Sequence, residues 1–147
     1  MKKQRIGIRT AIAAAALVAL ASGCALPEDT TDDKPKKELG ETDITVGVKK
    51  ILKEFEDNEL AADEKYKGKV VEIKNGKVNK VDTELLNDKA YVLNIGSGGE
   101  YEFTTVNCTG LPKSTLASLK VGDKVRVAGE FKDGGDLGVD LENCAIR

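Results

Sequence analysis

The chemistry open to this chain is limited first by an absence, because its 147 residues include no histidine. Histidine is the commonest general base, activator of nucleophiles and transition-metal ligand in proteins. One pair of carboxylates, Asp133 and Asp136, flanks two glycines, and the sequence Asp-Gly-Gly-Asp is more typical of a hairpin turn than of acid–base catalysis. We therefore expect a protein that is not an enzyme.

Two further patterns could suggest a bound ion or phosphate, and neither is complete. The segment Gly96-Ser97-Gly98-Gly99 lacks the helix and the lysine that follow the glycines of a phosphate-binding loop, so it predicts a turn. The acidic residues of segment 29–33 lack the turn glycine and the bidentate acid of a calcium loop. The sequence thus predicts no metal site and no cofactor.

Cys24 lies at the end of a leader that begins with basic residues and has small residues directly before the cysteine. An alanine-, leucine- and valine-rich run over residues 10–21 separates the two parts. The leader, residues 1–23, resembles a bacterial lipoprotein signal peptide, which is cut before the cysteine. The resemblance implies lipid on Cys24, a diacylglyceryl group and an acyl chain such as palmitate, which is enough for stable anchoring. A simple export signal with an unmodified Cys24 is the alternative.

The apolar run of the leader is also too short to span a bilayer, for which about 20 residues are needed. We therefore expect the membrane to be reached only through the lipid on Cys24, at the extracytoplasmic face of the cell membrane or of the outer membrane. Ala25 follows the cysteine, and in a cell with two membranes this resembles the pattern of the outer membrane.

The lipoprotein resemblance leaves Cys108 and Cys144 as the one remaining pair of cysteines. An oxidising compartment outside the cytoplasm would preserve a disulfide between them. Such a bridge would close a loop of nearly 40 residues and stabilise the fold by roughly 3 to 4 kcal/mol in the chain-entropy model. Two buried, reduced cysteines are the alternative.

Charge is distributed unevenly along the chain. Four of the 23 basic residues lie in the leader and none of the 25 acidic residues does, so the chain that follows is acidic. The excess of acid lies in residues 25–65, whereas residues 66–147 hold twelve basic and twelve acidic residues. A dedicated nucleic-acid binder normally has a basic domain or face, so we expect nucleic acid to be an unlikely partner.

The chain after the leader divides into three parts. Residues 24–41 are polar, with two prolines in the sequence ALPEDTTDDKPKKELGE after the cysteine, which predicts a flexible tether. Residues 42–65 place apolar side chains at helical spacing from Ile44 to Phe55 and predict an amphipathic helix that packs on the next domain. Residues 66–147 form that domain.

In the third part, β-branched and aromatic residues recur at every second position between turn residues, and this pattern predicts five strands. They run over residues 69–81, with a bulge at Asn75-Gly76, and over 90–95, 101–108, 124–131 and 137–146, with a short helix at 112–119. This order is that of a mainly β fold, the five-stranded OB-fold Greek-key barrel. Its third and fifth strands are parallel neighbours, which would bring Cys108 close to Cys144.

Several short sequences, in this order, narrow the resemblance. They are the run from Asn58 to Lys69, Gly76-Lys77-Val78, Leu119 to Val125, and Leu141-Glu142-Asn143-Cys144. Together they resemble the tRNA_anti-like family of bacterial OB-fold lipoproteins. The family name refers to the fold of anticodon-binding domains and does not imply that the chain binds tRNA.

OB-folds usually bind their ligands over the second and third strands. Candidate ligand-binding residues on that face are Tyr91 and Tyr101, with Lys80, Lys89 and Lys132 at its margins. Tyrosines there can stack on bases or sugar rings, although packing in the barrel is the favoured interpretation of both.

Three functions remain. The first is a lipid-anchored, non-enzymatic OB-fold module that binds an envelope ligand or a protein partner. The second is an oligonucleotide-binding OB domain, and the third is a structural envelope protein that acts through the helix of residues 42–65. The sequence does not indicate an oligomeric state.

Overall fold

The computed structural model describes residues 38–84, 87–99 and 102–147, all within one compact unit, Lys34–Arg147. The predicted leader, Cys24 and most of the tether lie outside the described residues. Of the helices in the described part, none is long and apolar enough to cross a membrane.

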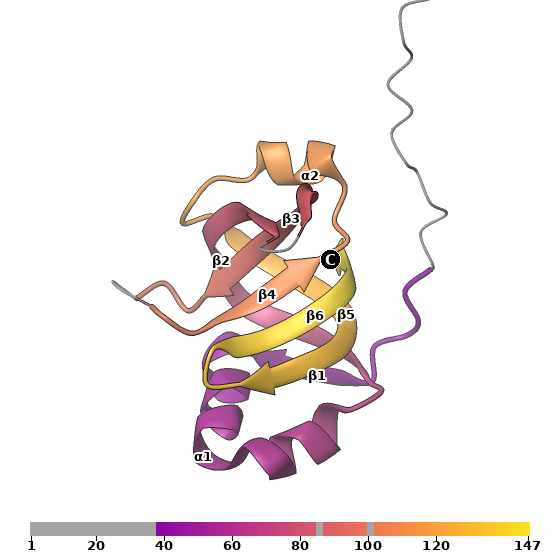
Figure 1. Cartoon of the computed structure of the whole chain (residues 1–147), viewed down its shortest axis with the longest axis vertical. Helices are drawn as coiled ribbons and strands as arrows, with labels where there is room; N and C mark the ends of the chain where they lie inside the picture. Colours follow the sequence, from indigo (N-terminus) through magenta and orange to yellow (C-terminus); the bar gives the residue numbers. More distant parts are fainter. Residues whose placement is uncertain (1–37, 85–86, 100–101) are drawn as a thin grey trace, which may run out of the picture. The chain divides into compact units, whose positions relative to one another are not determined.

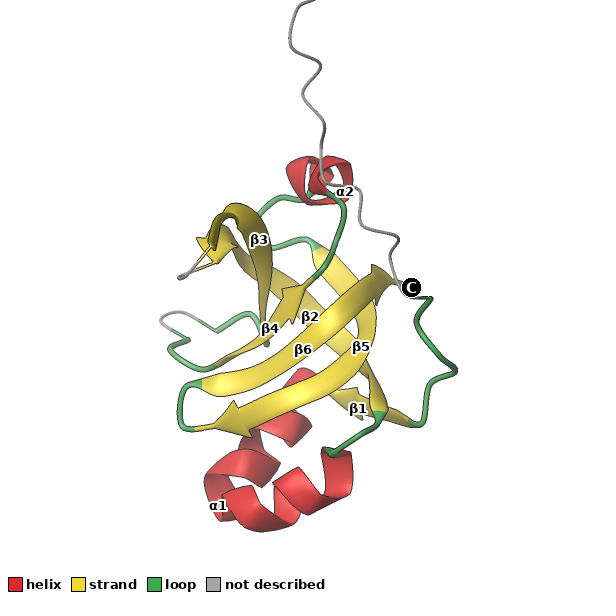
Figure 2. Cartoon of the chain, turned by 45° about the vertical axis from the view of Figure 1, so that its right-hand side comes forward, coloured by secondary structure: helices red, strands yellow, loops and turns green. Residues whose placement is uncertain are grey.

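A barrel of antiparallel and parallel strands forms the body of the domain (Figure 1). Its elements in chain order are β1 (Ile44–Gly47), α1 (Val48–Tyr66), β2 (Val70–Glu84), β3 (Asn87–Gly96), β4 (Thr105–Thr109), α2 (Lys113–Ser118), β5 (Lys124–Gly135) and β6 (Gly138–Ile146). The sheet order is β1-β2-β3-β4-β6-β5, and pairing of β2 with β5 closes the barrel. The predicted fold class, a mainly β OB-fold with two helices, is confirmed. The two helices lie at opposite ends of the barrel (Figure 2).

The bulge predicted in the first barrel strand is present. Pairing of β2 with β5 shifts its register between Ile73 and Gly76, and Asn75 takes a left-handed conformation with φ of 60°. Asparagine accepts this conformation more readily than most residues. A side chain on Gly76 would lie 2.4 Å from the side chain of Ile95 in the core. The bulge therefore lets one long strand bend around the barrel and serve two halves of it.

The predicted start of the N-terminal helix is wrong. Residues 44–47 form strand β1, which pairs in parallel with the first half of β2, Ile44 opposite Val71. Two features favour a strand here. The residues are mostly β-branched, and β3 pairs with β2 only from Lys77 onward, which leaves the edge of the first half of β2 available. The helix begins at Val48 instead.

Helix α1 is also kinked, at Asn58, where φ is −164° and ψ is 91°. The Asn58 side-chain oxygen accepts a hydrogen bond from the backbone N–H of Ala61 (3.1 Å), as an N-cap does at a helix start. The kink brings Lys65 to Glu54, with 2.5 Å between ammonium and carboxylate, and Tyr66 donates to the same carboxylate (2.7 Å). Burial and the hydrogen bond to Glu54 raise the pKa of Tyr66 to about 12.

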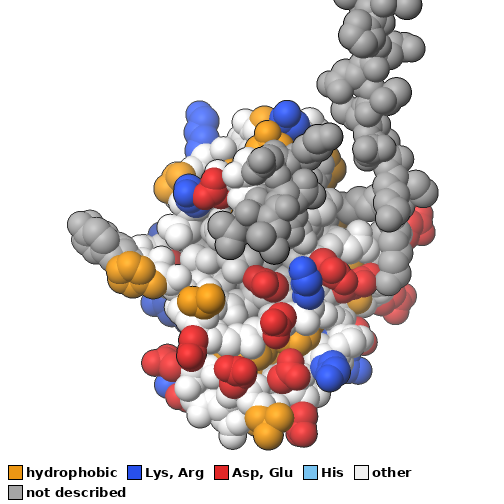
Figure 3. Space-filling model, in the orientation of Figure 1, with side chains coloured by type: hydrophobic (Ala, Val, Ile, Leu, Met, Phe, Trp, Pro, Cys, Tyr) orange, Lys and Arg blue, Asp and Glu red, His pale blue; other side chains and the backbone are white. Residues whose placement is uncertain are grey.

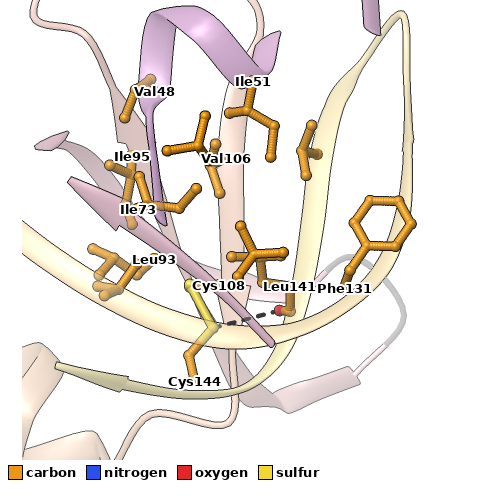
Figure 4. Packing of buried hydrophobic residues seen from close by; sticks show 14 of the residues in the cluster. Val48, Ile51, Ile73, Leu93, Ile95, Val106, Cys108, Phe131, Leu141 and Cys144 are labelled. Atoms are coloured by element: carbon orange, nitrogen blue, oxygen red, sulfur yellow. Dashed lines mark hydrogen bonds between the residues drawn. A yellow bond between two sulfur atoms is a disulfide. The ribbon is translucent and has the colours of Figure 1, made fainter. Parts of the chain in front are cut away.

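Helix α1 packs its apolar side chains on the barrel. Phe55 stacks on both Tyr66 and Phe131 of β5, and the Tyr66 and Phe131 rings are tilted to one another, with ring centroids 5.8 to 6.0 Å apart in the three pairs. The remaining buried residues of α1 are Val48, Ile51 and Ala62, which join the hydrophobic core drawn in part in Figure 4. The apolar side of this helix is therefore occupied by its own domain.

Cys108 and Cys144 form a disulfide inside the barrel, with Cα atoms 5.8 Å apart and a separation of 36 positions in sequence (Figure 4). Strands β4 and β6 are parallel neighbours, as the predicted topology requires, and Cys108 lies opposite Leu141. Both cysteines are fully buried. The bridge therefore ties two neighbouring strands together beneath the outer face of the sheet.

The predicted hairpin turn at Asp133–Asp136 is wrong by two residues. Strand β5 continues through Gly135, which pairs with Gly138, and the turn consists of Asp136 and Leu137. Gly138 takes φ of 123° as the chain enters β6. The glycines extend the hairpin because they leave room for α1: a side chain on Gly134 would lie 2.4 Å from the Phe55 ring.

Candidate functional site

A groove of about 690 Å³ lies over the face formed by β3, β4 and β6, between the second half of β2 and the tip of the β5–β6 hairpin. It is lined by residues of five strands and by Glu59 of α1. This is the part of an OB-fold over which ligands usually bind. We call it the acidic groove because of the charges described below.

A chain of hydrogen-bonded polar side chains forms the floor of the acidic groove. The Asn94 amide donates to the side-chain oxygen of Asn107 (2.8 Å), and the Asn107 amide donates to a carboxylate oxygen of Asp140 (2.8 Å). The Thr105 hydroxyl donates to the same Asn107 oxygen (2.8 Å). Because Asn94, Asn107 and Asp140 are directly opposite one another on adjacent strands, the floor is held in one arrangement.

Part of this floor remains open to a ligand. Within the described residues, the side-chain oxygen of Asn94 and the second carboxylate oxygen of Asp140 accept no hydrogen bond. Both atoms are hydrogen-bond acceptors. The amide groups of Asn94 and Asn107 already donate to other side chains of the floor. A ligand that donates hydrogen bonds would therefore find acceptors in the floor.

The walls of the acidic groove carry an excess of negative charge. Within the described part of the chain, five carboxylate residues line it against a single ammonium, that of Lys132, and these acidic residues are Glu59, Asp82, Asp133, Asp136 and Asp140. One of them is neutralised in part, because Asp82 pairs with Lys80, and this pair lowers the pKa of Asp82. Figure 3 shows more Asp and Glu than Lys and Arg side chains over the lower half of this view. A polyanion would be repelled here, and a cation attracted.

The structure brings few of the sequence-predicted residues into this groove. Lys132 lines it, and Lys80 reaches it only through its ion pair with Asp82. Tyr91 is half-buried and packs against the core, with the Lys113 ammonium 5.3 Å from its ring centroid. Tyr101 and the side chain of Lys89 lie outside what the structure describes.

Sequence reasoning missed the floor of the groove. Asn94, Asn107 and Asp140 are each flanked by buried apolar residues on both sides, a pattern that marks the outward position of a strand. That signal was available in the alternation of each strand. The register that joins the three residues is not, because it depends on pairing between strands far apart in sequence.

The glycine-rich segment after β3 is a turn, as predicted, and its backbone donors are occupied. The Glu102 carboxylate accepts hydrogen bonds from the N–H groups of Ser97 (2.7 Å), Gly98 (3.3 Å) and Gly99 (3.1 Å), and from the Ser97 hydroxyl. Burial raises the pKa of Glu102, but these hydrogen bonds outweigh it and leave the pKa below its usual value. The segment is therefore filled by the chain's own carboxylate.

Within the described residues, no group of three or more Cys, Asp or Glu side chains is arranged to hold a metal ion. The carboxylates of the acidic groove thus line a wide surface rather than converge on one point.

A second groove, of about 580 Å³, lies at the bulge of β2. Of the described residues, five with cationic side chains and no Asp or Glu line it, and the five are Lys74, Lys77, Lys124, Arg126 and Arg147. We call it the basic groove. It shares no lining residue with the acidic groove, although β2 and β5 contribute to both.

Comparison with known proteins gives a family and a fold. The sequence matches the tRNA_anti-like family over residues 1–145. A crystal structure from Klebsiella pneumoniae, named a "putative nucleic acid-binding lipoprotein", superposes with a TM-score of 0.56 at 18% identity, covering 70% of this chain and 90% of that one. At this identity the likeness supports the fold alone. No curated protein matches the sequence.

Proposed function

The chain belongs to the tRNA_anti-like family of OB-fold proteins, and from this premise we propose that it is a lipid-anchored, non-enzymatic binding module of the cell envelope. The acidic groove is its ligand site. The ligand is a cationic envelope molecule or a basic segment of a protein partner.

The observation that carries this proposal is the combination of a polar floor and acidic walls on the face that OB-folds use for binding. Acceptors in the floor fit a ligand with N–H or O–H donors. Five carboxylates against one ammonium favour a ligand with positive charge, and they would also speed its encounter at low ionic strength.

The anchor is the second part of the proposal. The leader and Cys24 support lipid attachment, as does the family match, which extends over the leader. Mass spectrometry of the chain extracted from membranes would detect the lipid on its first peptide. Cys24→Ser should release the protein from the membrane fraction; if it stays there, the anchor is elsewhere.

Nucleic-acid binding is the alternative function, favoured by the name of the Klebsiella protein. Oligonucleotides bind OB-folds through a basic groove and exposed aromatic rings. Among the residues that the structure describes, the lining of the acidic groove has neither, since its one cation is Lys132 and it contains no aromatic residue. The proposal therefore assigns this groove to a different class of ligand.

The third function, a partner contact through α1, has less support from the packing. The apolar residues of α1 that would form such a contact are buried against the barrel. Of its large apolar side chains, Leu60 at the kink is exposed to 71%.

Titration of the chain Ala25–Arg147, observed by amide NMR, tests the ligand site. The probes are a short lysine-rich peptide, soluble cell-wall fragments and a single-stranded oligonucleotide. We expect saturable shifts in the floor strands with a cationic probe or with the cell-wall fragments. Saturable oligonucleotide shifts on that face, which weaken steeply with salt, would contradict the proposal.

Matched variants locate the binding. Asp136→Asn with Asp140→Asn removes two groove charges and preserves the acceptor that Asn107 uses. Glu56→Gln with Glu64→Gln removes two charges from the exposed side of α1. The first pair should weaken the binding of the cationic peptide roughly tenfold or more, and the second by less than about twofold.

A further inference from the structure

We propose that the basic groove is a membrane-docking site that binds the phosphate headgroups of anionic lipids. The inference goes beyond the ligand of the acidic groove. It rests on the proposed lipid anchor for its setting, because the anchor would hold the domain at a bilayer surface.

The cations of the basic groove are available to a ligand. Arg126 pairs with Glu72, which accepts from its Nε (2.8 Å) and from its terminal nitrogen (2.5 Å). The other four form no ion pair with any carboxylate of the described residues, and they are Lys74, Lys77, Lys124 and Arg147. Residues 66–147 hold equal numbers of acidic and basic residues, so this groove concentrates positive charge in a domain that is neutral as a whole.

The fold positions these cations together. At the bulge, Lys74 and Asn75 fall between the paired positions Ile73 and Gly76, so the strand bends there. Lys77 is opposite Lys124 on β5, which places two ammonium-bearing residues side by side. Lys77 also lies across Gly98, where a side chain would meet its ammonium at 2.7 Å. A like-charged cluster of this kind destabilises the isolated domain and is relieved by an anion.

The lining fits a phosphate surface better than single-stranded nucleic acid. Besides the cations, its lining within the described part of the chain consists of Asn75, Gly76 and Val125, and none of these offers an aromatic ring to stack on a base. An anionic bilayer presents many phosphates without bases, and it attracts clusters of lysine and arginine.

Exposed apolar side chains next to the groove support the same partner. The turn of residues 120–123 is fixed beside Lys77 by two hydrogen bonds to Val78. The Gly122 N–H donates to the Val78 carbonyl and the Val78 N–H donates to the Asp123 carbonyl, both at 2.8 Å. Val121 in this turn is 74% exposed. Ile146, which precedes Arg147, is exposed as well. Cations with adjoining apolar side chains are typical of surfaces that lie on a bilayer.

Vesicle co-sedimentation of the chain Ala25–Arg147, which has no anchor, tests the docking site directly. The vesicles are phosphatidylcholine alone, or phosphatidylcholine with about one third phosphatidylglycerol. We expect binding to the anionic vesicles, little binding to the neutral ones, and a steep loss of binding as salt is raised. Equal binding to both kinds of vesicle, or to neither, would overturn the proposal.

A matched pair of triple variants separates the groove from net charge. Lys74→Gln, Lys77→Gln and Lys124→Gln should reduce binding to anionic vesicles roughly tenfold or more. Lys49→Gln, Lys67→Gln and Lys69→Gln carry the same net charge with exposed lysines outside the groove, and should reduce it by less than about threefold. Equal losses in the two variants would mean general attraction and would overturn the site. Circular dichroism verifies that both triple variants fold. If the groove variant does not fold, the single change Lys124→Glu replaces it.

Two further arms separate this proposal from the others. The variant Asp136→Asn with Asp140→Asn should retain vesicle binding, because the acidic groove shares no residue with the basic one. If a single-stranded oligonucleotide displaces the vesicles and depends on the same three lysines, the groove is a nucleic-acid site and the membrane proposal is overturned.

Discussion

The two grooves of this domain are built from the same two long strands and have opposite charge. The first halves of β2 and β5 supply four of the five cations that line the basic groove, Arg147 supplies the fifth, and no described Asp or Glu lines it. The second halves help to line the acidic groove, where five carboxylates face one ammonium. A net charge near zero for residues 66–147 therefore conceals two charged surfaces.

The difference also extends to what lies beneath each groove. The acidic groove has a floor of interlocked side chains on β3, β4 and β6, with the disulfide of Cys108 and Cys144 buried beneath it. The basic groove lies over a bulge, where the ladder between β2 and β5 is interrupted. One region is a surface whose polar side chains are hydrogen-bonded to one another, and the other is a cluster of long cationic side chains over an interrupted ladder.

Replacing both Cys108 and Cys144 by alanine should lower the stability more than any other change considered, and the structural disturbance should be centred beneath the acidic groove. Loss of the bridge lowers the free energy of unfolding by about 3 kcal/mol in the chain-entropy model. Urea unfolding of Ala25–Arg147 measures it, and amide shifts should concentrate in β4 and β6. A reducing agent should lower the stability of the wild type and leave the variant unchanged. A wild type that resists the reductant with no change in midpoint would contradict the account.

Gly134→Ala should disturb the wall of the acidic groove through α1. Its methyl group would lie 2.4 Å from the Phe55 ring, so helix and hairpin must separate, at a cost of about 2 kcal/mol. Gly135→Ala is the matched control, since its nearest neighbour is the end of the flexible Glu59 side chain, at 3.1 Å. Thermal unfolding compares the two. Equal losses of stability would show that the Phe55 contact has no special role.

Asn107→Ala should break the floor of the acidic groove without touching the basic one. The change removes the shared partner of Asn94, Thr105 and Asp140 and should cost about 1 to 2 kcal/mol. Asn79→Ala, an exposed position on β2, should be nearly neutral. The sharper readout is binding. Asn107→Ala should weaken the binding of the cationic peptide, while vesicle binding should persist. If vesicle binding falls equally, the two grooves are not independent.

Glu102→Gln should have the smallest effect, and its effect should depend on pH. The pKa of Glu102 is lowered in the folded chain, so its contribution is present above the ordinary glutamate pKa and is lost as pH falls through the folded value. With solvent screening the loss should be below about 1 kcal/mol near neutral pH. Urea unfolding of both proteins should give a difference that disappears at acid pH. A difference that persists there would assign the effect to packing.

The loop that Glu102 holds, Ser97 to Gly99, also borders the basic groove. Gly98, held by the Glu102 carboxylate, supports the side chain of Lys77. Glu102→Gln should therefore alter vesicle binding slightly, while the cationic peptide binds as before.

The strand order could be predicted from the sequence because alternation and turn residues are local signals. The bulge at Asn75 followed from the same local signals, whereas the parallel pairing that brings Cys108 to Cys144 followed from the topology of the OB-fold, and both are confirmed. Strand β1 and the kink at Asn58 could not be predicted in this way. The first depends on an edge of β2 that only the assembled sheet leaves open, and the second interrupts a run of good helix formers.

The grooves depended even more on long-range pairing. The three residues of the floor are 13 and 33 residues apart in sequence, and only the register of β3, β4 and β6 makes them neighbours. Tyr91 packs against the core, the interpretation that the alternation of its strand favoured over ligand stacking. Composition gave the total charge of the domain and could not give its separation into two surfaces.

Parallel NMR titrations with two small probes test the central claim most directly, that two grooves of opposite charge bind separate ligands. The account predicts that a short lysine-rich peptide shifts amides of residues 92–94, 107–109 and 132–140, and that glycerol phosphate shifts those of 74–77 and 124–126. Each probe should bind unchanged in the presence of the other. If both probes shift the same amides, or if neither gives a saturable shift, the account of two independent sites is contradicted.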